Sequence, residues 1–313
     1  MCRLKKINIK KFIFYILISS IIIFFVCTGY VLSSCSLEQK NDEKSKVSRN
    51  DKTIEPVRIV YAEWDSEIAS SYVLKAVIEK KLGYKCELLA VTLTSLWESV
   101  AAGDMDVMVA AWLPSLHQHH QQKYRDHVVN LGPNLEGTKS GLVVPEYIPI
   151  NSIEQLREFS DKFNGNIIGI EPDSGIMKKT REVMVEYNLK NKFDLIPGSD
   201  STMTTILKKA LAEKKWVVIT GWTPHWMFAK WNLKYLKDPK NIYGGKEHIS
   251  TIVRKGLKRD RPDVYEFLDK FYWDADDMQE CMLMIEKKNM TPEDAALKWI
   301  NNNKTKVKKW FAG

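Results

Sequence analysis

From residue 57 onward, short apolar runs alternate with stretches of helical length, and this alternation limits the fold more than any other feature. The expected strands are 57–62, 85–91, 107–112, 141–145, 166–171, 192–196, 216–221 and 250–253. The expected helices include 67–82, 93–102, 152–163, 175–189, 201–214, 262–272 and 291–311. Strands separated by helices predict an α/β fold whose sheets are covered on both faces. The stretch from Pro56 to Gly313 exceeds the usual size of one core, so two lobes are expected.

The first 34 residues have the charge and order of an export signal: five Lys and Arg, no acid, and an apolar run from Phe12 to about Leu32. The ending Leu32, Ser33, Ser34, Cys35 resembles the lipobox of bacterial lipoproteins, in which the signal is cleaved before the cysteine and the cysteine carries the lipid. An uncleaved membrane anchor is the alternative. Residues 35–55 are polar and free of aromatic side chains, which predicts a flexible tether. Both alternatives place the rest of the chain on the outer face of the cell membrane.

Charge and cysteine content exclude several classes of function. Five of the eight net positive charges belong to the signal, which leaves +3 for the remainder, so the basic pI does not indicate nucleic-acid binding. Beyond the lipobox only Cys86 and Cys281 remain, and no C-x-x-C occurs, so neither a zinc knuckle nor a thioredoxin-type site is indicated. We interpret both cysteines as packing residues, and the sequence does not decide whether they form a disulfide.

Ten tryptophans fall into two groups. Trp64, Trp112 and Trp222 each stand at the carboxyl end of an expected strand, which is where open α/β sheets place their ligands. Trp222 is followed by Thr223, the expected N-cap of a helix that starts at Pro224. The other seven are predicted to be core residues: Trp97, Trp216, Trp226, Trp231, Trp273, Trp299 and Trp310.

Three indoles at one edge of the sheets indicate a site for a quaternary ammonium group. Such a group has no N–H to donate, so aromatic faces recognise it better than hydrogen-bond acceptors do. A second contact is predicted in "EPDSGIM", where a helix begins near Gly175 with Asp173 or Ser174 as its cap. The backbone N–H groups of Gly175 and Ile176 then form an anion site at the helix N-terminus.

The segments "WDSEIAS", "AAWLPSLH", "LGPNLEG", "GLVVP", "EPDSGIM", "TGWTPHWMF" and "YGGKEHISTIVRKG" together resemble the glycine betaine binding proteins of osmoprotectant ABC transporters. This resemblance covers nearly all of residues 57–310. It implies a type II periplasmic-binding-protein-like fold in which two lobes, joined by two crossing segments, close on the ligand. With crossings near "LVVPEY" and "STIVRK", residues 57–145 and 251–313 form one lobe and residues 146–250 the other.

The resemblance also implies the site and the partners. Trp64, Trp112 and Trp222 surround the trimethylammonium group, and His117, Gly175 and Ile176 contact the carboxylate. The ligand is glycine betaine or proline betaine, and the partners are a membrane permease and its ATPase subunit. No cofactor, metal or nucleic acid is implied. A binding protein that prefers choline or carnitine remains an alternative, and pocket width cannot be judged from spacing.

Two other classes of function fit individual histidines but lack the rest of their motifs. The segment "HQHHQQKYRDH" adds histidines between His117 and His127, which would suit a metal-binding lipoprotein, although no carboxylate or cysteine completes a ligand set. His117 and His225 could serve an enzyme as acid or base, but no nucleophile motif, P-loop or H-E-x-x-H accompanies them. We therefore interpret the chain as a binding protein without catalytic activity, and His225 as a helix-start residue that is buried or hydrogen-bonded locally.

Overall fold

The computed structural model describes residues 55–245, 247–288 and 290–312. The predicted signal (1–34), the lipidation site Cys35 and the tether up to residue 54 lie outside the described residues. Among the described helices, none combines the length and the apolar character that crossing a membrane requires.

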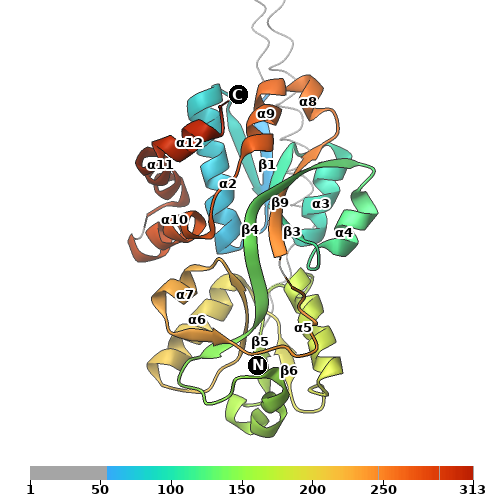
Figure 1. Ribbon diagram of the computed structural model, residues 1–313, viewed down its shortest axis with the longest axis vertical. Coiled ribbons are helices and arrows are strands. Elements are labelled where there is room, and N and C mark those ends of the chain that lie inside the picture. The colour runs from blue at the N-terminus through green and yellow to red at the C-terminus, as the bar shows by residue number, and fades with distance from the viewer. Residues whose placement is uncertain (1–54, 246, 289, 313) are drawn as a thin grey trace, which may run out of the picture. The chain divides into compact units, whose positions relative to one another are not determined.

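The first lobe is built on a mixed sheet (Figure 1). Its strands, in spatial order, are β2 (Cys86–Ala90), β1 (Val57–Tyr61), β3 (Val107–Leu113), β9 (Glu247–Arg254) and the first part of β4 (Val128–Pro145). β1 runs parallel to β2 and β3, whereas β9 is antiparallel to β3 and β4. Every residue of β3 is buried, as its unbroken apolar sequence requires. The helices between these strands are α2 (Asp65–Val77), continued by the π-helical turn η1 (Ile78–Leu82), α3 (Leu93–Ala102) and α4 (Gln118–Tyr124).

The second lobe has a smaller sheet. Its strands are the last part of β4, then β7 (Ile219–Thr223), β5 (Asn166–Ile168) and β6 (Asp194–Ile196), with β8 (Leu233–Tyr235) paired to β4. Its helices are the 3₁₀ segment η2 (Ile153–Phe163), α5 (Gly175–Glu186), α6 (Asp200–Ala212) and α7 (Trp226–Lys230). Parallel pairing of β5 with β6 and β7 brings the carboxyl ends of these strands to one edge.

Strand β4 belongs to both lobes, and Figure 1 shows it running from one to the other. Residues 128–138 pair with β9, whereas residues 139–143 pair with β7 and 143–145 with β8. The register with β9 shifts three times, which bends the strand on its way between the lobes. The two-lobed α/β fold with crossing segments is thus confirmed.

The C-terminal helices pack on the first lobe. They are α8 (Leu257–Asp260), α9 (Pro262–Lys270), α10 (Ala275–Lys288), α11 (Pro292–Asn302) and α12 (Lys304–Lys309). α10 and α11 lie against α2. The single helix expected over 291–311 is wrong, because the helix is interrupted at Asn303, which ends α11 and precedes α12.

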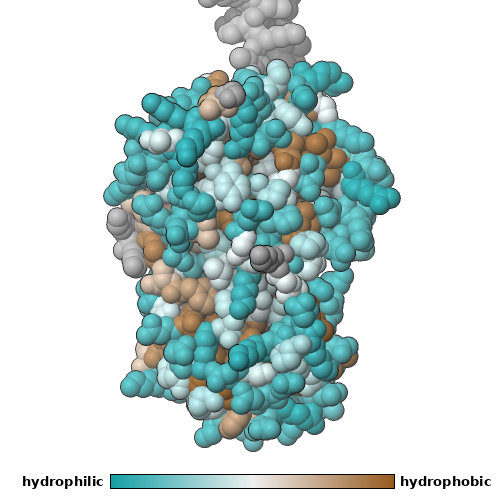
Figure 2. Space-filling view, viewed as in Figure 1, coloured by the Kyte–Doolittle hydropathy of each residue, from teal (hydrophilic) through white to brown (hydrophobic). Residues whose placement is uncertain are grey.

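The core confirms most of the burial predictions. Of the seven tryptophans expected in the core, five are buried, but Trp216 and Trp231 are half-buried at its margin. Cys86 and Cys281 are both free thiols. On the face shown in Figure 2, hydrophilic residues predominate and hydrophobic ones form small groups, as expected when the large aromatic side chains are mostly interior.

Candidate functional site

One cavity lies between the two lobes. Its walls are Trp64, Trp112, Leu116, His117, Ile170, Ser174, Gly175, Ile176 and Trp222, and it encloses about 300 Å³, open solvent at its mouth included. The structure therefore brings all six predicted ligand contacts to one cavity, together with Leu116, Ile170 and Ser174. The first lobe contributes the residues up to His117, and the second lobe contributes the rest.

The three tryptophans of this cavity, hereafter the tryptophan cage, come from three strand ends. Trp64 is the N-cap residue of α2 just after β1, Trp112 is the penultimate residue of β3, and Trp222 lies within β7. The predicted helix start at Thr223 and Pro224 is wrong. His225 is the N-cap instead, because its Nδ1 accepts the backbone N–H of Met227 at 3.1 Å. This contact confirms His225 as a buried helix-start residue.

The indole N–H groups of the three cage tryptophans differ in their hydrogen-bond acceptors. Trp112 Nε1 donates to Glu67 Oε1 at 2.8 Å, within the first lobe. Trp64 Nε1 donates to Glu171 Oε2 at 2.9 Å, a bond that joins the first lobe to the second. For the buried Nε1 of Trp222, the described residues provide no acceptor. Two cage rings are thus fixed at their edges by acidic side chains that the sequence did not single out.

His117 is buried and its tautomer follows from its contacts. Nδ1 accepts the backbone N–H of Trp112 at 3.2 Å, so in the neutral ring the proton lies on Nε2. The backbone N–H of His117 in turn donates to Trp112 O at 2.9 Å. Burial lowers the pKa of His117 to about 3, with His120 adding to the effect. The side chain is therefore a neutral N–H donor at the cavity wall, not a cation.

Gly175 and Ile176 are the first residues of α5, and Ser174 is the N-cap. The predicted anion site thus has the expected position, at the N-terminus of a twelve-residue helix on the cavity wall. A Cβ atom at Gly175 would lie 2.5 Å from Leu116 O and 2.8 Å from Leu116 Cβ. Only glycine lets the backbone of the second lobe approach the loop of the first this closely.

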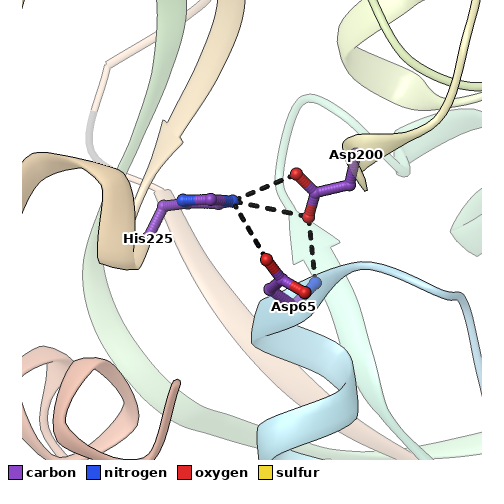
Figure 3. Close-up of side chains that lie close together, drawn as sticks. All are labelled: Asp65, Asp200 and His225. Atoms are coloured by element: carbon purple, nitrogen blue, oxygen red, sulfur yellow. Dashed lines mark hydrogen bonds and ion pairs between the residues drawn. The ribbon is translucent and has the colours of Figure 1, made fainter. Parts of the chain in front are cut away.

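A second cluster joins the lobes beside the cavity (Figure 3). Asp65 of α2 meets Asp200 of α6 and His225: the Asp65 N–H donates to Asp200 Oδ2 at 3.0 Å, and His225 Nε2 is 3.1 Å from Asp200 Oδ1. Asp65 also accepts the indole N–H of Trp226. Burial, then Asp200, raises the pKa of Asp65 to about 6, and His225 and Trp226 oppose that rise.

The ligand atoms of this cluster lie close enough together to hold a metal ion. Because Nδ1 of His225 already accepts the Met227 N–H, the neutral ring carries its proton on Nε2, which then has no lone pair for a metal. The same proton suits a hydrogen bond to Asp200. The geometry therefore favours contact between the lobes over cation binding.

The extra histidines do not converge. His119 and His120 are neighbours, with ring centroids 5.8 Å apart. However, His120 stacks on Trp97, and Nδ1 of His117 accepts the backbone N–H of Trp112. In the part of the chain that the structure describes, no trio of potential metal ligands includes any of His117 to His127.

Comparison with known proteins gives a consistent picture. The family model OpuAC, the substrate-binding domain of ABC-type glycine betaine transport systems, matches residues 55–302. The glycine betaine/carnitine transport binding protein GbuC of Listeria monocytogenes is 48% identical over 158 residues, which is 50% of this chain and 52% of that protein. That match spans about half the length of the relative.

Solved structures extend the similarity to the fold. Lactococcal OpuAC in its closed-liganded conformation, complexed with glycine betaine, superimposes with a TM-score of 0.78 at 46% identity, covering 82% of this chain and 100% of that one. An ABC-transporter choline binding protein in complex with choline superimposes with a TM-score of 0.76 at 26% identity, covering 82% of this chain and 91% of that one.

Proposed function

Because this chain belongs to the OpuAC family, the substrate-binding domains of ABC-type glycine betaine transport systems, we propose that it captures glycine betaine outside the cell for uptake. Proline betaine has the same arrangement of charges and is included in the proposal. The bound ligand is delivered to a membrane permease that carries its own ATPase. The observation that supports this most is that three indole rings and a set of N–H donors line one cavity between two lobes.

The trimethylammonium group binds in the tryptophan cage. Its charge is diffuse and weakly hydrated, so it exchanges water for the negative faces of aromatic rings. A desolvated contact of this kind contributes about 2 kcal/mol, so three rings supply roughly 6 kcal/mol. Micromolar binding needs about 8 kcal/mol, and the remainder is left to the carboxylate.

The carboxylate binds to Nε2–H of His117 and to the backbone N–H groups of Gly175 and Ile176. These donors are supported by the tautomer of His117 and by the position of α5. All three donors are uncharged, so selectivity for an anion comes from hydrogen bonds and the helix N-terminus rather than from a salt bridge. A ligand without a carboxylate leaves these donors without their partner.

Closure of the lobes encloses the ligand. We assign the hinge to the two segments that pass between the lobes. One lies within β4, a few residues before the crossing expected near "LVVPEY", and the other lies ahead of β9, before the crossing expected near "STIVRK". Three contacts across the cleft support a closed form: Trp64 with Glu171, Asp65 with Asp200, and Gly175 with Leu116. Each of these contacts is lost when the lobes separate.

Lipidation of Cys35 and a tether over residues 35–55 would hold the binding lobes at the outer membrane surface, next to the permease. This part of the proposal rests on the sequence alone. Metabolic labelling with a fatty acid tests it: a Cys35→Ala variant should lose the label and the membrane association. Label that persists in the variant would contradict the anchor.

A choline- or carnitine-preferring protein is the second candidate. It is favoured by the similarity to a choline binding protein and by the name of the Listeria relative. Calorimetric titration of the purified protein with glycine betaine, carnitine and choline separates the candidates. Tight betaine binding with weak choline binding supports the proposal, and a preference for choline would refute the role given to His117, Gly175 and Ile176. If none of the three compounds binds, the proposed class of ligand is wrong.

A further inference from the structure

Two of the three cage rings donate their indole N–H to a carboxylate, and one of these carboxylates is fully buried. Glu67 has no exposed surface, and its Oε1 accepts from Trp112 Nε1 at 2.8 Å. For Oε2 of Glu67, the described residues supply no hydrogen-bond partner. Burying an acid with one oxygen unsatisfied is costly, so a structural role alone explains Glu67 poorly.

Indoles elsewhere in this chain show that an acid is not needed to satisfy the ring. Trp310 donates its N–H to the backbone carbonyl of Tyr272 at 2.7 Å. The buried Nε1 atoms of Trp97, Trp273 and Trp299 have no partner at all among residues 55–245, 247–288 and 290–312. Acidic acceptors occur at Trp64, Trp112 and Trp226, which lie in or beside the cavity. What an acid adds to an indole, beyond a hydrogen bond, is negative charge.

We propose that Glu67 is a specificity-determining positioning residue, which orients Trp112 and places negative charge behind it, so that the cavity prefers a cationic head group to a neutral one of the same shape. The inference rests on the proposed function. Glu67 does not line the cavity, so it acts through Trp112 and through its field. Because Glu67 is buried, its field at the cavity is screened less than the field of a surface charge.

The protonation of Glu67 provides an observable. Burial raises the pKa of Glu67 to about 8, and the hydrogen bond from Trp112 is the largest effect that opposes that rise. The empty site therefore holds a mainly protonated carboxyl at pH 7. An arriving cation favours the ionised form, and the O–H bond of Glu67 breaks as the proton leaves to solvent. Because the empty protein then binds more protons than the complex, affinity rises with pH and levels off above about 8.

Other titratable groups surround this pair without setting its pKa. The groups that shift the pKa of Glu67 besides burial are all uncharged. His117, next to Trp112, is neutral through this range because its pKa is about 3. The remaining charged or titratable side chains that the structure describes on α2 and on the elements packed against it are as follows: Asp65, Tyr72 and Lys75 on α2, Arg58 and Tyr61 on β1, Cys86 and Glu87 on β2, Glu79, Lys80 and Lys81 on η1, Asp276, Asp277, Glu280, Cys281 and Glu286 on α10, and Glu293, Asp294 and Lys298 on α11.

The test compares glycine betaine with 3,3-dimethylbutanoate, which has the same shape and carboxylate but a neutral head group. Glu67→Gln keeps an oxygen that can accept the Trp112 N–H and removes the charge. It resembles the protonated acid of the empty site, so the variant should fold. The preference for betaine over the isostere should fall about tenfold at pH 8.5 in Glu67→Gln, and the rise of affinity with pH should flatten. The matched control Glu63→Gln, at an exposed glutamate, should change neither.

A second readout uses the wild type alone. Calorimetry at pH 7.5 in two buffers of different ionisation enthalpy should show release of part of one proton on betaine binding and none on isostere binding. An unchanged preference and pH profile in Glu67→Gln, or no proton release in the wild type, would overturn the inference while leaving the proposed function intact. A wild type that does not bind betaine refutes the proposed function, and this inference with it.

Discussion

The chain contains two clusters of tryptophan that burial does not distinguish. The cage residues Trp64, Trp112 and Trp222 are 6%, 3% and 5% exposed, and the C-terminal residues Trp273, Trp299 and Trp310 are 0%, 0% and 3% exposed. In the C-terminal cluster the rings pack on one another. The ring centroids of Trp273 and Trp299 are 5.5 Å apart in an edge-to-face contact, and those of the stacked Trp299 and Trp310 are 6.0 Å apart. In the described part of the chain, no two cage rings form such a pair, since the cavity lies between them.

The difference shows how one side chain serves two purposes. A ring covered on both faces by other side chains contributes packing and nothing else. A ring with one face on a cavity needs another means of holding its orientation, and Trp64 and Trp112 are held by acids at their edges. The two clusters should therefore respond differently to the same substitution.

The largest effect is expected in the C-terminal cluster. Trp299→Ala removes a fully buried ring and should lower the free energy of unfolding by about 3–5 kcal/mol. Betaine affinity, measured at a temperature where the variant is folded, should stay within a factor of about two, since Trp299 does not line the cavity. Urea unfolding and calorimetric titration check both statements. A large loss of affinity in the folded variant would break the distinction between the clusters.

Substitutions in the tryptophan cage should show the reverse pattern, with a large loss of betaine affinity and a smaller loss of stability. Trp112→Ala and Trp222→Ala each remove a cation–π contact and should weaken betaine binding by about 2 kcal/mol or more. The free energy of unfolding of the empty protein should fall by less than in Trp299→Ala, because one face of each ring adjoins the cavity. Titration and urea unfolding of both variants measure this. Normal binding by these two variants would show that the cage is assigned wrongly.

A smaller and selective effect is expected at His117. His117→Ala removes one N–H donor to a charged carboxylate and should weaken betaine binding by about 1.5 kcal/mol. Choline, which has no carboxylate, should be affected less. His117→Gln restores a side-chain N–H donor and should recover part of the loss. Equal losses for betaine and choline would mean that His117 only packs against the cage.

The smallest effect concerns closure and not recognition. In Gly175→Ala, the added Cβ meets Leu116 of the opposite lobe and should weaken betaine and choline alike by about 1 kcal/mol. Gly198→Ala is the matched control, because its added Cβ makes only ordinary contacts within its own lobe, the nearest at 3.4 Å from Gly169 O. A Gly175→Ala variant that binds both ligands like the wild type would show that the lobes need not approach this closely.

The order of strands and helices was largely predictable, because it depends on the spacing of apolar residues within short segments of the sequence. The features that the sequence did not predict depend largely on contacts between residues far apart in the chain. The first part of β4, residues 128–138, reads as a polar and glycine-containing loop, yet it pairs with β9 through a register shifted three times. The break at Asn303 is not evident from the sequence either, since Val307 and Trp310 keep helical spacing from Ile300 across the polar residues 301–306.

The site was predictable where position on a strand decides it. Trp64, Trp112 and Trp222 could be chosen because each stands at a strand end, and Gly175 because it follows a cap. Glu67 and Asp200 could not be chosen, because their partners lie 45 and 135 positions away. No local spacing indicates that Glu67 meets Trp112 within the first lobe, or that Asp200 meets Asp65 across the two lobes, because tertiary packing decides both contacts.

A crystal structure of the protein with glycine betaine would test the central claim most directly. The account predicts the quaternary nitrogen within about 6 Å of the ring centroids of Trp64, Trp112 and Trp222. It also predicts the carboxylate within hydrogen-bonding distance of Nε2 of His117 and of the backbone nitrogens of Gly175 and Ile176. A ligand bound outside this cavity, or with its carboxylate among the tryptophans, would contradict the account.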